Sequence, residues 1–159
     1  MDFHTRAVPL LVFLEKLFGK THYARIADSK PNVDSPKFSE AFKDARVRFT
    51  HFARAGDDTA ASTTAAYAAI LRSMAFQCHH NQRAVNIVIP VVLEDGALKE
   101  NIMTAILISV KDRVTCRTQA SVDIDAPKLS FFPPAQDCAG KTSDTRPYIS
   151  LVMELGTVP

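Results

Sequence analysis

Basic and aromatic side chains alternate along the stretch from Arg46 to Arg54. Arg46, Arg48 and Arg54 carry positive charge, and Phe49 and Phe52 stand between them. Arginine binds phosphate oxygens and an exposed aromatic ring stacks on a nucleobase, so this pattern is typical of nucleic-acid contacts. The same composition also suits an ordinary solvated surface beside a core, and nearby aspartates lower the local positive charge. The pattern therefore favours an ordinary solvated face, and nucleic-acid contact through Arg46, Arg48 and Arg54 is the alternative.

A second group that could do chemistry is formed by Cys78, His79 and His80. Histidine is a common metal ligand and exchanges a proton near neutral pH. We expect this group to end a long helix, on which adjacent residues face different directions and cannot hold one metal ion together. Histidine suits a helix end because it interacts with the helix dipole, and a helical cysteine behaves as a small hydrophobic residue. The pattern therefore favours a structural role over catalysis.

The bulk composition is that of one globular domain. The chain has 159 residues, 47% of them hydrophobic and 23% charged, and its formal net charge is +2. A chain of this length forms one hydrophobic core, so we expect a single domain over residues 1–159. The small net charge neither requires nor excludes a nucleic-acid partner.

No segment has the pattern of a membrane span or of a secretion signal. The longest apolar run near the N-terminus covers residues 7–14, far short of the roughly 20 residues that cross a bilayer. Charged residues follow it directly, unlike the cleavage region of a signal peptide. The three cysteines, Cys78, Cys116 and Cys138, form no CxxC motif and predict neither a disulfide framework nor a zinc site. We therefore expect an intracellular protein, cytoplasmic or nuclear, with no membrane partner.

Hydrophobic periodicity predicts three helices. Residues 8–18 carry apolar side chains at helical spacing and end at Gly19. Breakers and cap formers indicate a loop over residues 24–36, and Ser35 followed by Pro36 is a cap and first-turn pair that begins a second helix. The alanine-rich residues 60–80 predict the longest helix. Residues 47–52 alternate, which over six residues fits either a short strand or a continuing helix.

Runs rich in β-branched residues predict three strands, over residues 84–93, 102–111 and 147–155. The first two should form an antiparallel pair, and Pro90 within the first indicates an edge position or a bulge. Residues 115–146, rich in breakers, are predicted to be mostly loop. These elements predict an α/β fold in which helices pack on a small mixed β-sheet. Because the last strand ends four residues before the terminus, we expect the natural chain to continue and this one to be truncated.

Two segments carry a resemblance to the restriction-endonuclease-like core. AVNIVIPVVLEDG followed by ILISVKDR is similar to the adjacent strands of its PD-(D/E)xK motif. The resemblance implies that Ser109 and Lys111 match the acidic residue and the lysine of the motif, and that Asn86 occupies the place of the first-strand aspartate. In that core, carboxylates hold Mg²⁺ near the scissile phosphate and the lysine helps to orient or activate water. Asn86 and Ser109 are neutral, so the resemblance implies a degenerate catalytic motif.

Other residues could take over part of the motif's chemistry. Glu94 and Asp95, at the end of the first strand, could hold Mg²⁺, although acidic residues before glycine are also ordinary turn formers. Lys111 could contact a phosphate, or it could simply extend into solvent from the end of a buried strand. Arg113 follows closely and joins the three arginines of the basic and aromatic stretch in the expected nucleic-acid-binding set.

A wider resemblance is carried by four segments, RFTHFARAGDD, SMAFQCHHNQ, ILISVKDR and RPYISLVMELG. They are similar to recurrent segments of an uncharacterised family of fungal proteins, of basidiomycete type, with nuclease-like folds. The resemblance covers about residues 14–156. It implies a degenerate nuclease-like domain without strong catalysis that binds nucleic acid or phosphate, or, if active, a nuclease that depends on Mg²⁺. The alternative is a non-catalytic protein-interaction or regulatory module, a fragment of a larger fungal protein.

Overall fold

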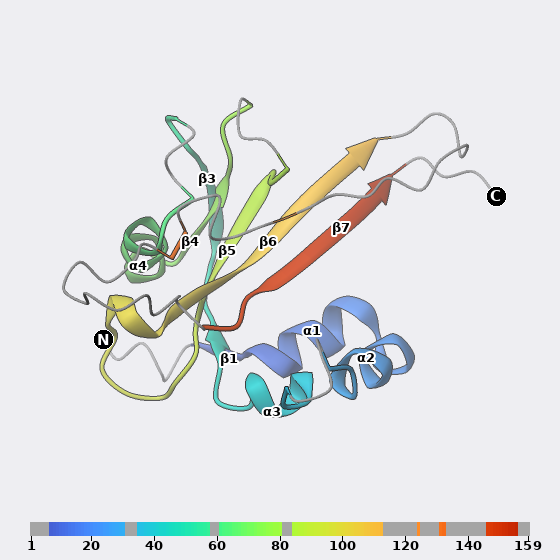
Figure 1. Cartoon of the computed structure of the whole chain (residues 1–159). Coiled ribbons are helices and arrows are strands. Elements are labelled where there is room, and N and C mark those ends of the chain that lie inside the picture. The colour runs from blue at the N-terminus through green and yellow to red at the C-terminus, as the bar shows by residue number, and fades with distance from the viewer. Residues whose placement is uncertain are drawn as a thin grey trace, which may run out of the picture.

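The computed structural model of the chain describes residues 7–30, 35–57, 61–80, 84–112, 124, 131–132 and 146–155. These residues form a mixed α/β structure in which helices cover both faces of one seven-stranded, mostly antiparallel sheet (Figure 1). No helix in this part of the chain is long and apolar enough to cross a membrane. The expected α/β class is confirmed, although the sheet is larger than the three predicted strands.

The described elements follow one another along the chain as strands and short helices. The helices are α1 Leu10–Phe18, α2 Lys20–Ala27, α3 Phe38–Ala41 and α4 Thr63–Leu71, with a 3-10 turn η2 at Glu100–Ile102. The strands are β1 Val8–Pro9, β2 Arg46–Val47, β3 His51–Arg54, β4 Met74–Gln77, β5 Ile87–Val92, β6 Met103–Asp112 and β7 Ile149–Leu155. The three predicted strands are confirmed as β5, β6 and β7, and β5 and β6 form the expected antiparallel pair.

The strands are arranged around β5 and β6. β6 lies between β5 and β7, and β7 runs parallel to β6. On its other side β5 pairs with β4 at its first two residues and with β2 at its last two. β3 runs parallel to β4 beyond it, and β1 pairs with β2. β3 and β7 therefore lie at opposite edges of the described sheet.

Pro90 indicated an edge position or a bulge, but β5 is an interior strand of the described sheet and its register with β6 is unbroken from Ile87 to Val92, so neither is found on that side. Pro90 falls between the stretch that pairs with β4 and the stretch that pairs with β2, and its ladder partner is Ala105 of β6 alone. Proline lacks an amide hydrogen and is normally confined to positions where a ladder bond is missing. The gap between two short neighbouring strands provides such a position inside the sheet.

Alternate residues of β5 and β6 face two separate clusters of the core. One face packs on α1 through side chains that include Ile89, Val91, Ile106 and Ile108. The other packs on α4 through side chains that include Val88, Val92, Ala105 and Leu107. We call these the α1 face and the α4 face. Burial on both faces explains why these strands have nearly continuous apolar sequences.

The N-terminal helices differ from the prediction in length. α1 ends before Gly19, as expected, and Gly19 has φ 76°, a left-handed conformation that glycine adopts without strain. α2 follows at once, so the loop expected from residue 24 begins only after α2 ends. α3 is a single turn that starts after Lys37 rather than at Ser35, and the Lys37 amide donates to Oε2 of Glu40 at 3.2 Å.

The long helix expected over residues 60–80 is wrong in its second half. α4 begins after Ser62, whose Oγ accepts from the amide of Ala65 at 3.2 Å, and it ends after nine residues. Ser73 then adopts φ 55°, and the chain enters β4. The sequence MAFQ suits either a helix or a strand locally, and pairing with β3 and β5 makes it a strand. Residues 47–52, for which both structures were open, contribute to β2 and β3.

The predicted loop-rich segment, residues 115–146, lies largely outside the described residues. Within it, Ile124, Phe131 and Phe132 are buried in the cluster on the α4 face. The amide of Thr63, at the start of α4, donates to the carbonyl of Phe131 at 3.0 Å. A segment with few apolar residues therefore still contributes to the core.

Candidate nucleic-acid interface

The three positions of the nuclease-like motif come to one end of the β5–β6 pair. Ser109 and Lys111 are two residues apart in β6, so they point to the same face, which is the α4 face. The antiparallel register, extended by one residue beyond the pair Ile87 and Ile108, places Asn86 opposite Ser109. The described sheet therefore gathers these positions, and their individual contacts decide what they can do.

Asn86 is hydrogen-bonded to the backbone of both neighbouring strands. Its Oδ1 accepts from the amide of Val110 at 2.7 Å, and its own amide donates to the carbonyl of Ile108 at 2.7 Å. Its carbonyl accepts from the amide of Cys78 at 2.8 Å. The side chain thus replaces a backbone carbonyl where the β5–β6 ladder ends. Asn86 joins three strands, and its amide oxygen is already used as an acceptor.

Ser109 lies inside the protein rather than in an open site. Its side chain is 0% exposed, and its Oγ has no hydrogen-bond partner among the described residues. A hydroxyl buried without a partner costs about 1–3 kcal/mol. Water and substrate must both reach a hydrolytic metal ion, so Ser109 offers no accessible ligand.

Lys111 is half-buried and stands beside Glu154 of β7 in the parallel register.

The expected acidic ligands lie at the far end of β5. Glu94 and Asp95 follow the last residue of β5, whereas Asn86 precedes its first. At a rise of about 3.3 Å per residue, β5 separates the two ends by roughly 20 Å, too far to share a metal ion. Among the described residues, no group of three or more His, Cys, Asp or Glu side chains could hold a metal ion.

The predicted arginines do not form one cluster. Arg46 makes a two-point ion pair with Asp95, with Nε to Oδ1 at 2.5 Å and Nη2 to Oδ2 at 3.1 Å. This contact raises the pKa of Arg46 and joins β2 to the bend after β5. Arg48 is half-buried and lines a separate cavity of about 330 Å³ beside Phe49. Arg113 lies outside the described residues.

Arg54 shares an open part of the sheet with Phe52. The β3–β4 register pairs Phe52 with Ala75 and Arg54 with Gln77, and Gln77 in turn pairs with Ile87 of β5. Paired residues point to the same face, and Ala75 packs in the cluster on the α1 face. Phe52, Arg54 and Gln77 therefore all lie on the α1 face. Figure 1 shows the far end of β3 well away from α1, α2 and α3, which cover the other end of this face.

A cleft of about 530 Å³ opens beside Phe52. Its lining consists of Phe52, Gln77, Asn86, Ile87 and Val110. The Phe52 side chain is 53% exposed, and its ring centroid lies 5.5 Å from that of Phe49. We call Phe52, Arg54, Gln77 and this cleft the β3–β4 surface. Phe52 and Gln77 line the cleft, and Arg54 is the register partner of Gln77 on the same face.

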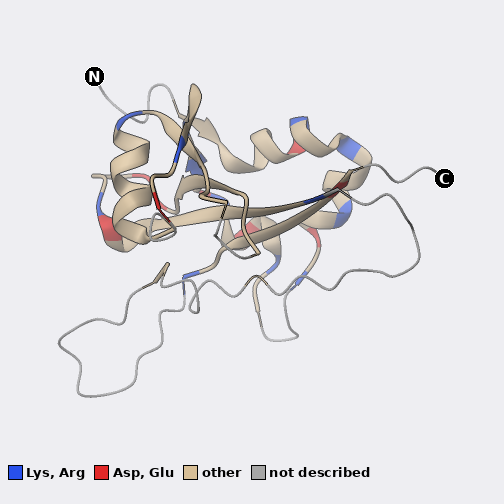
Figure 2. Ribbon diagram, turned by 90° about the horizontal axis from the view of Figure 1, so that it is seen from above, with Lys and Arg blue, Asp and Glu red and all other residues tan. Residues whose placement is uncertain are grey.

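Charge on the rest of the molecule is mixed. Figure 2 shows Lys and Arg on several elements, with Asp and Glu between them. Arg54 is exposed and makes no ion pair with any described residue. The β3–β4 surface therefore has an available cation, and the charges of the described residues around it are of both signs.

Strand pairing brings in residues that sequence reasoning missed. Gln77 and Val110 were not among the predicted site residues, because residues 60–80 were expected to be helical and Val110 belongs to a buried strand. Recognising Met74–Gln77 as a strand would have placed Gln77 on the same face as Ala75 by the two-residue period, but the period would not have shown that Gln77 is exposed.

Cys78, His79 and His80 follow β4 and do not end a helix, so their expected helix-end role is wrong. The two imidazole rings lie with centroids 4.0 Å apart, which the helical interpretation did not allow. Burial raises the pKa of the Cys78 thiol to about 11. A nucleophilic cysteine needs a lowered pKa, so this thiol is not activated.

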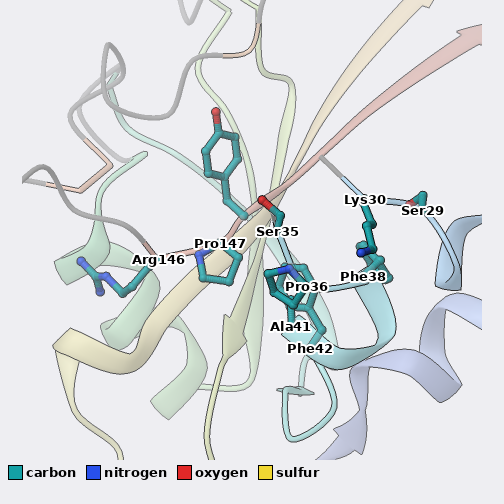
Figure 3. Close-up of a pocket in the computed structure, with 10 residues that line it drawn as sticks. Ser29, Lys30, Ser35, Pro36, Phe38, Ala41, Phe42, Arg146 and Pro147 are labelled. Carbon is teal, nitrogen blue, oxygen red and sulfur yellow. The ribbon is translucent and has the colours of Figure 1, made fainter. Parts of the chain in front are cut away.

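A larger cavity of about 750 Å³ lies between α3 and the start of β7 (Figure 3). Most of its lining is apolar, including Pro36, Phe38, Phe42 and Pro147. Figure 3 shows Arg146 pointing away from it. The Arg146 guanidinium donates to the carbonyls of Glu100 and Met103 at 2.8 and 2.9 Å and lies 4.7 Å from the centre of the Phe132 ring. The arginine is turned away, so Lys30, Ser29 and Ser35 provide the remaining polar side chains at one side of this cavity.

Comparison of the chain with protein-family models, with curated proteins and with solved structures gives no match in any of the three. The class of protein is therefore described from the fold and the candidate site alone. The described residues form a mixed α/β protein in which Phe52 and Arg54 lie exposed on one edge of the sheet. The restriction-endonuclease-like core and the fungal family stay predictions.

Proposed function

We propose that this protein is a non-catalytic nucleic-acid-binding protein that holds single-stranded DNA or RNA on the β3–β4 surface. One observation carries the proposal: Phe52, 53% exposed, stands beside a cleft on the same face as Arg54 and Gln77. A large aromatic side chain left in water on an open sheet is the usual platform for a stacked base.

Each group of this surface has a separate task in the proposal. The Phe52 ring stacks on one base, an interaction worth about 1–3 kcal/mol. The Gln77 side chain offers both a donor and an acceptor to the edge of that base. Arg54 binds the adjoining phosphate through charged hydrogen bonds. A base must leave its duplex to stack in this way, so single strands are the preferred ligand.

The motif positions argue against metal-dependent cleavage. Asn86 and Ser109 supply no carboxylate, and Ser109 is buried. Glu94 and Asp95 lie at the other end of β5, and Asp95 is paired with Arg46. A nuclease-like ancestor that lost its metal ligands would leave a protein of this kind. Lys111, on the opposite face of the sheet, is not required by the proposed binding mode.

Fluorescence anisotropy with labelled single-stranded DNA and RNA tests the role of the aromatic ring. We expect Phe52→Ala to weaken binding by about tenfold, in line with the loss of one stacked base, and Phe52→Tyr to retain the affinity. Leu71→Ala is the matched control, because Leu71 is 56% exposed on α4, away from this surface. Equal affinity of Phe52→Ala and the unchanged protein would contradict the proposal.

The same titrations at several salt concentrations test the phosphate contact. The slope of log K against log salt is negative, and Arg54→Gln should make it shallower by about 0.7, the value for one phosphate contact on a single strand. Arg72→Gln removes the same charge at the exposed end of α4 and should leave the slope unchanged. If single strands do not bind the unchanged protein at all, the protein-interaction alternative becomes the better description.

A further inference from the structure

β7 is an edge strand with an apolar surface. Among the described residues its one strand neighbour is β6, and Figure 1 shows it along the outer side of β6. Three of its large apolar side chains stay exposed, Val152 at 39%, Met153 at 40% and Leu155 at 49%. With respect to the described residues, both its outer backbone edge and these side chains are therefore available to another strand.

Within its own seven residues β7 lacks the side chains that usually protect an edge strand. Proteins protect such edges with lysine, proline, bulges or inward-pointing charges, or by covering them with a loop. The seven residues of β7, ISLVMEL, include neither lysine nor proline, and Glu154 is their only charged residue. Glu154 lies beside Lys111 in the register with β6, so its charge is partly balanced within the chain.

We propose that two copies of this protein associate by pairing their β7 strands, antiparallel, about a two-fold axis at Val152. A two-fold axis perpendicular to the sheet keeps each face on its own side, so a residue must lie opposite one of the same face. Centring the axis on Val152 aligns all seven residues. The opposed pairs are then Val152 with Val152, Leu151 with Met153, Ile149 with Leu155, and Ser150 with Glu154.

This pairing makes β7 complementary to itself. On the α1 face every opposed pair is apolar, and on the α4 face Glu154 meets a serine hydroxyl rather than a second carboxylate. Like charges directly opposite each other would destabilise the pairing, and none occurs here. A second copy therefore supplies the match in both side-chain type and charge. The outer edge of β7 lies on the opposite side of the sheet from β3, so the inference is independent of the proposed nucleic-acid binding.

The dimer should be reversible. A seven-residue strand pair forms a smaller interface than the roughly 1,600 Å² of a standard stable complex. We therefore expect sedimentation velocity to show a monomer at low concentration and a dimer at high concentration.

Two opposite charges at the axis test both the interface and its register. In Val152→Lys and in Val152→Glu, identical charges face each other across the axis, so each variant alone should associate at least tenfold more weakly. An equimolar mixture should regain the dimer, because lysine of one copy then opposes glutamate of the other. Val12→Lys is the control, since Val12 is 45% exposed on α1, and it should associate like the unchanged protein.

Circular dichroism of each variant confirms that the fold is kept. The inference is overturned if the unchanged protein remains monomeric throughout the concentration series, or if Val152→Lys associates normally. If the mixture of Val152→Lys and Val152→Glu, both folded, does not regain the dimer, the two-fold register at Val152 is overturned.

Discussion

A side-chain oxygen takes the place of a backbone oxygen at Asn86. In the motif interpretation this residue stands for a metal-binding aspartate, whereas in the structure its Oδ1 accepts from the Val110 amide at 2.7 Å. Ser109, the next position of the motif, is buried, and its hydroxyl has no hydrogen-bond partner in the part of the chain that the structure describes. At the scale of single residues, a motif names a candidate chemistry, and the hydrogen bonds decide whether the atoms remain free for it.

Asn86 should therefore matter for stability. We expect Asn86→Ala to lower the free energy of unfolding by about 1 kcal/mol, because the Val110 amide loses its acceptor. Asn86→Asp keeps an acceptor oxygen at the same place and should remain closer to the unchanged protein. Urea denaturation measures both, with Asn101→Ala, an exposed asparagine of η2, as the control. An Asn86→Ala protein as stable as the control would show that this hydrogen bond contributes nothing.

At the scale of elements, the boundary between α4 and β4 decides where the site lies. Ser73 has φ 55°, and its carbonyl accepts from the amide of Thr50 at 2.7 Å, just before β3 begins. This turn ends the helix and starts the strand that carries Gln77. Without it, the alanine-rich segment would continue as a helix, and Gln77 would not lie between Arg54 and Ile87.

The turn can be tested through its backbone conformation. A left-handed residue other than glycine costs about 1–2 kcal/mol, so Ser73→Gly should raise the free energy of unfolding by roughly 0.5–1 kcal/mol after the added chain entropy. Ser73→Val, with a branched side chain in the same conformation, should lower it by more than about 1 kcal/mol. Thermal and urea denaturation measure the two effects. The opposite order of stability would indicate a helix that continues through residue 73.

At the scale of the whole molecule, the separation of the two ends of β5 argues against metal-dependent hydrolysis. Incubation of labelled single- and double-stranded DNA and RNA with Mg²⁺ or Mn²⁺ should give no cleavage that depends on Lys111. Lys111→Ala is the necessary comparison, since it removes the one motif residue that keeps its chemistry. Turnover by the unchanged protein that disappears in Lys111→Ala would contradict this expectation and would indicate carboxylates reaching the site from elsewhere.

The sequence by itself determined the α/β class, the first helix and the strands β5, β6 and β7. These features depend on local properties, such as a run of β-branched residues or a glycine that ends a helix, and neighbouring residues are enough to specify them. Only the tertiary structure decided that MAFQ is a strand, that Pro90 sits inside the sheet, and that Phe52, Gln77 and Val110 border one cleft. Strand pairing joins residues far apart in the chain, and a short apolar segment is compatible with several partners until the core around it is complete.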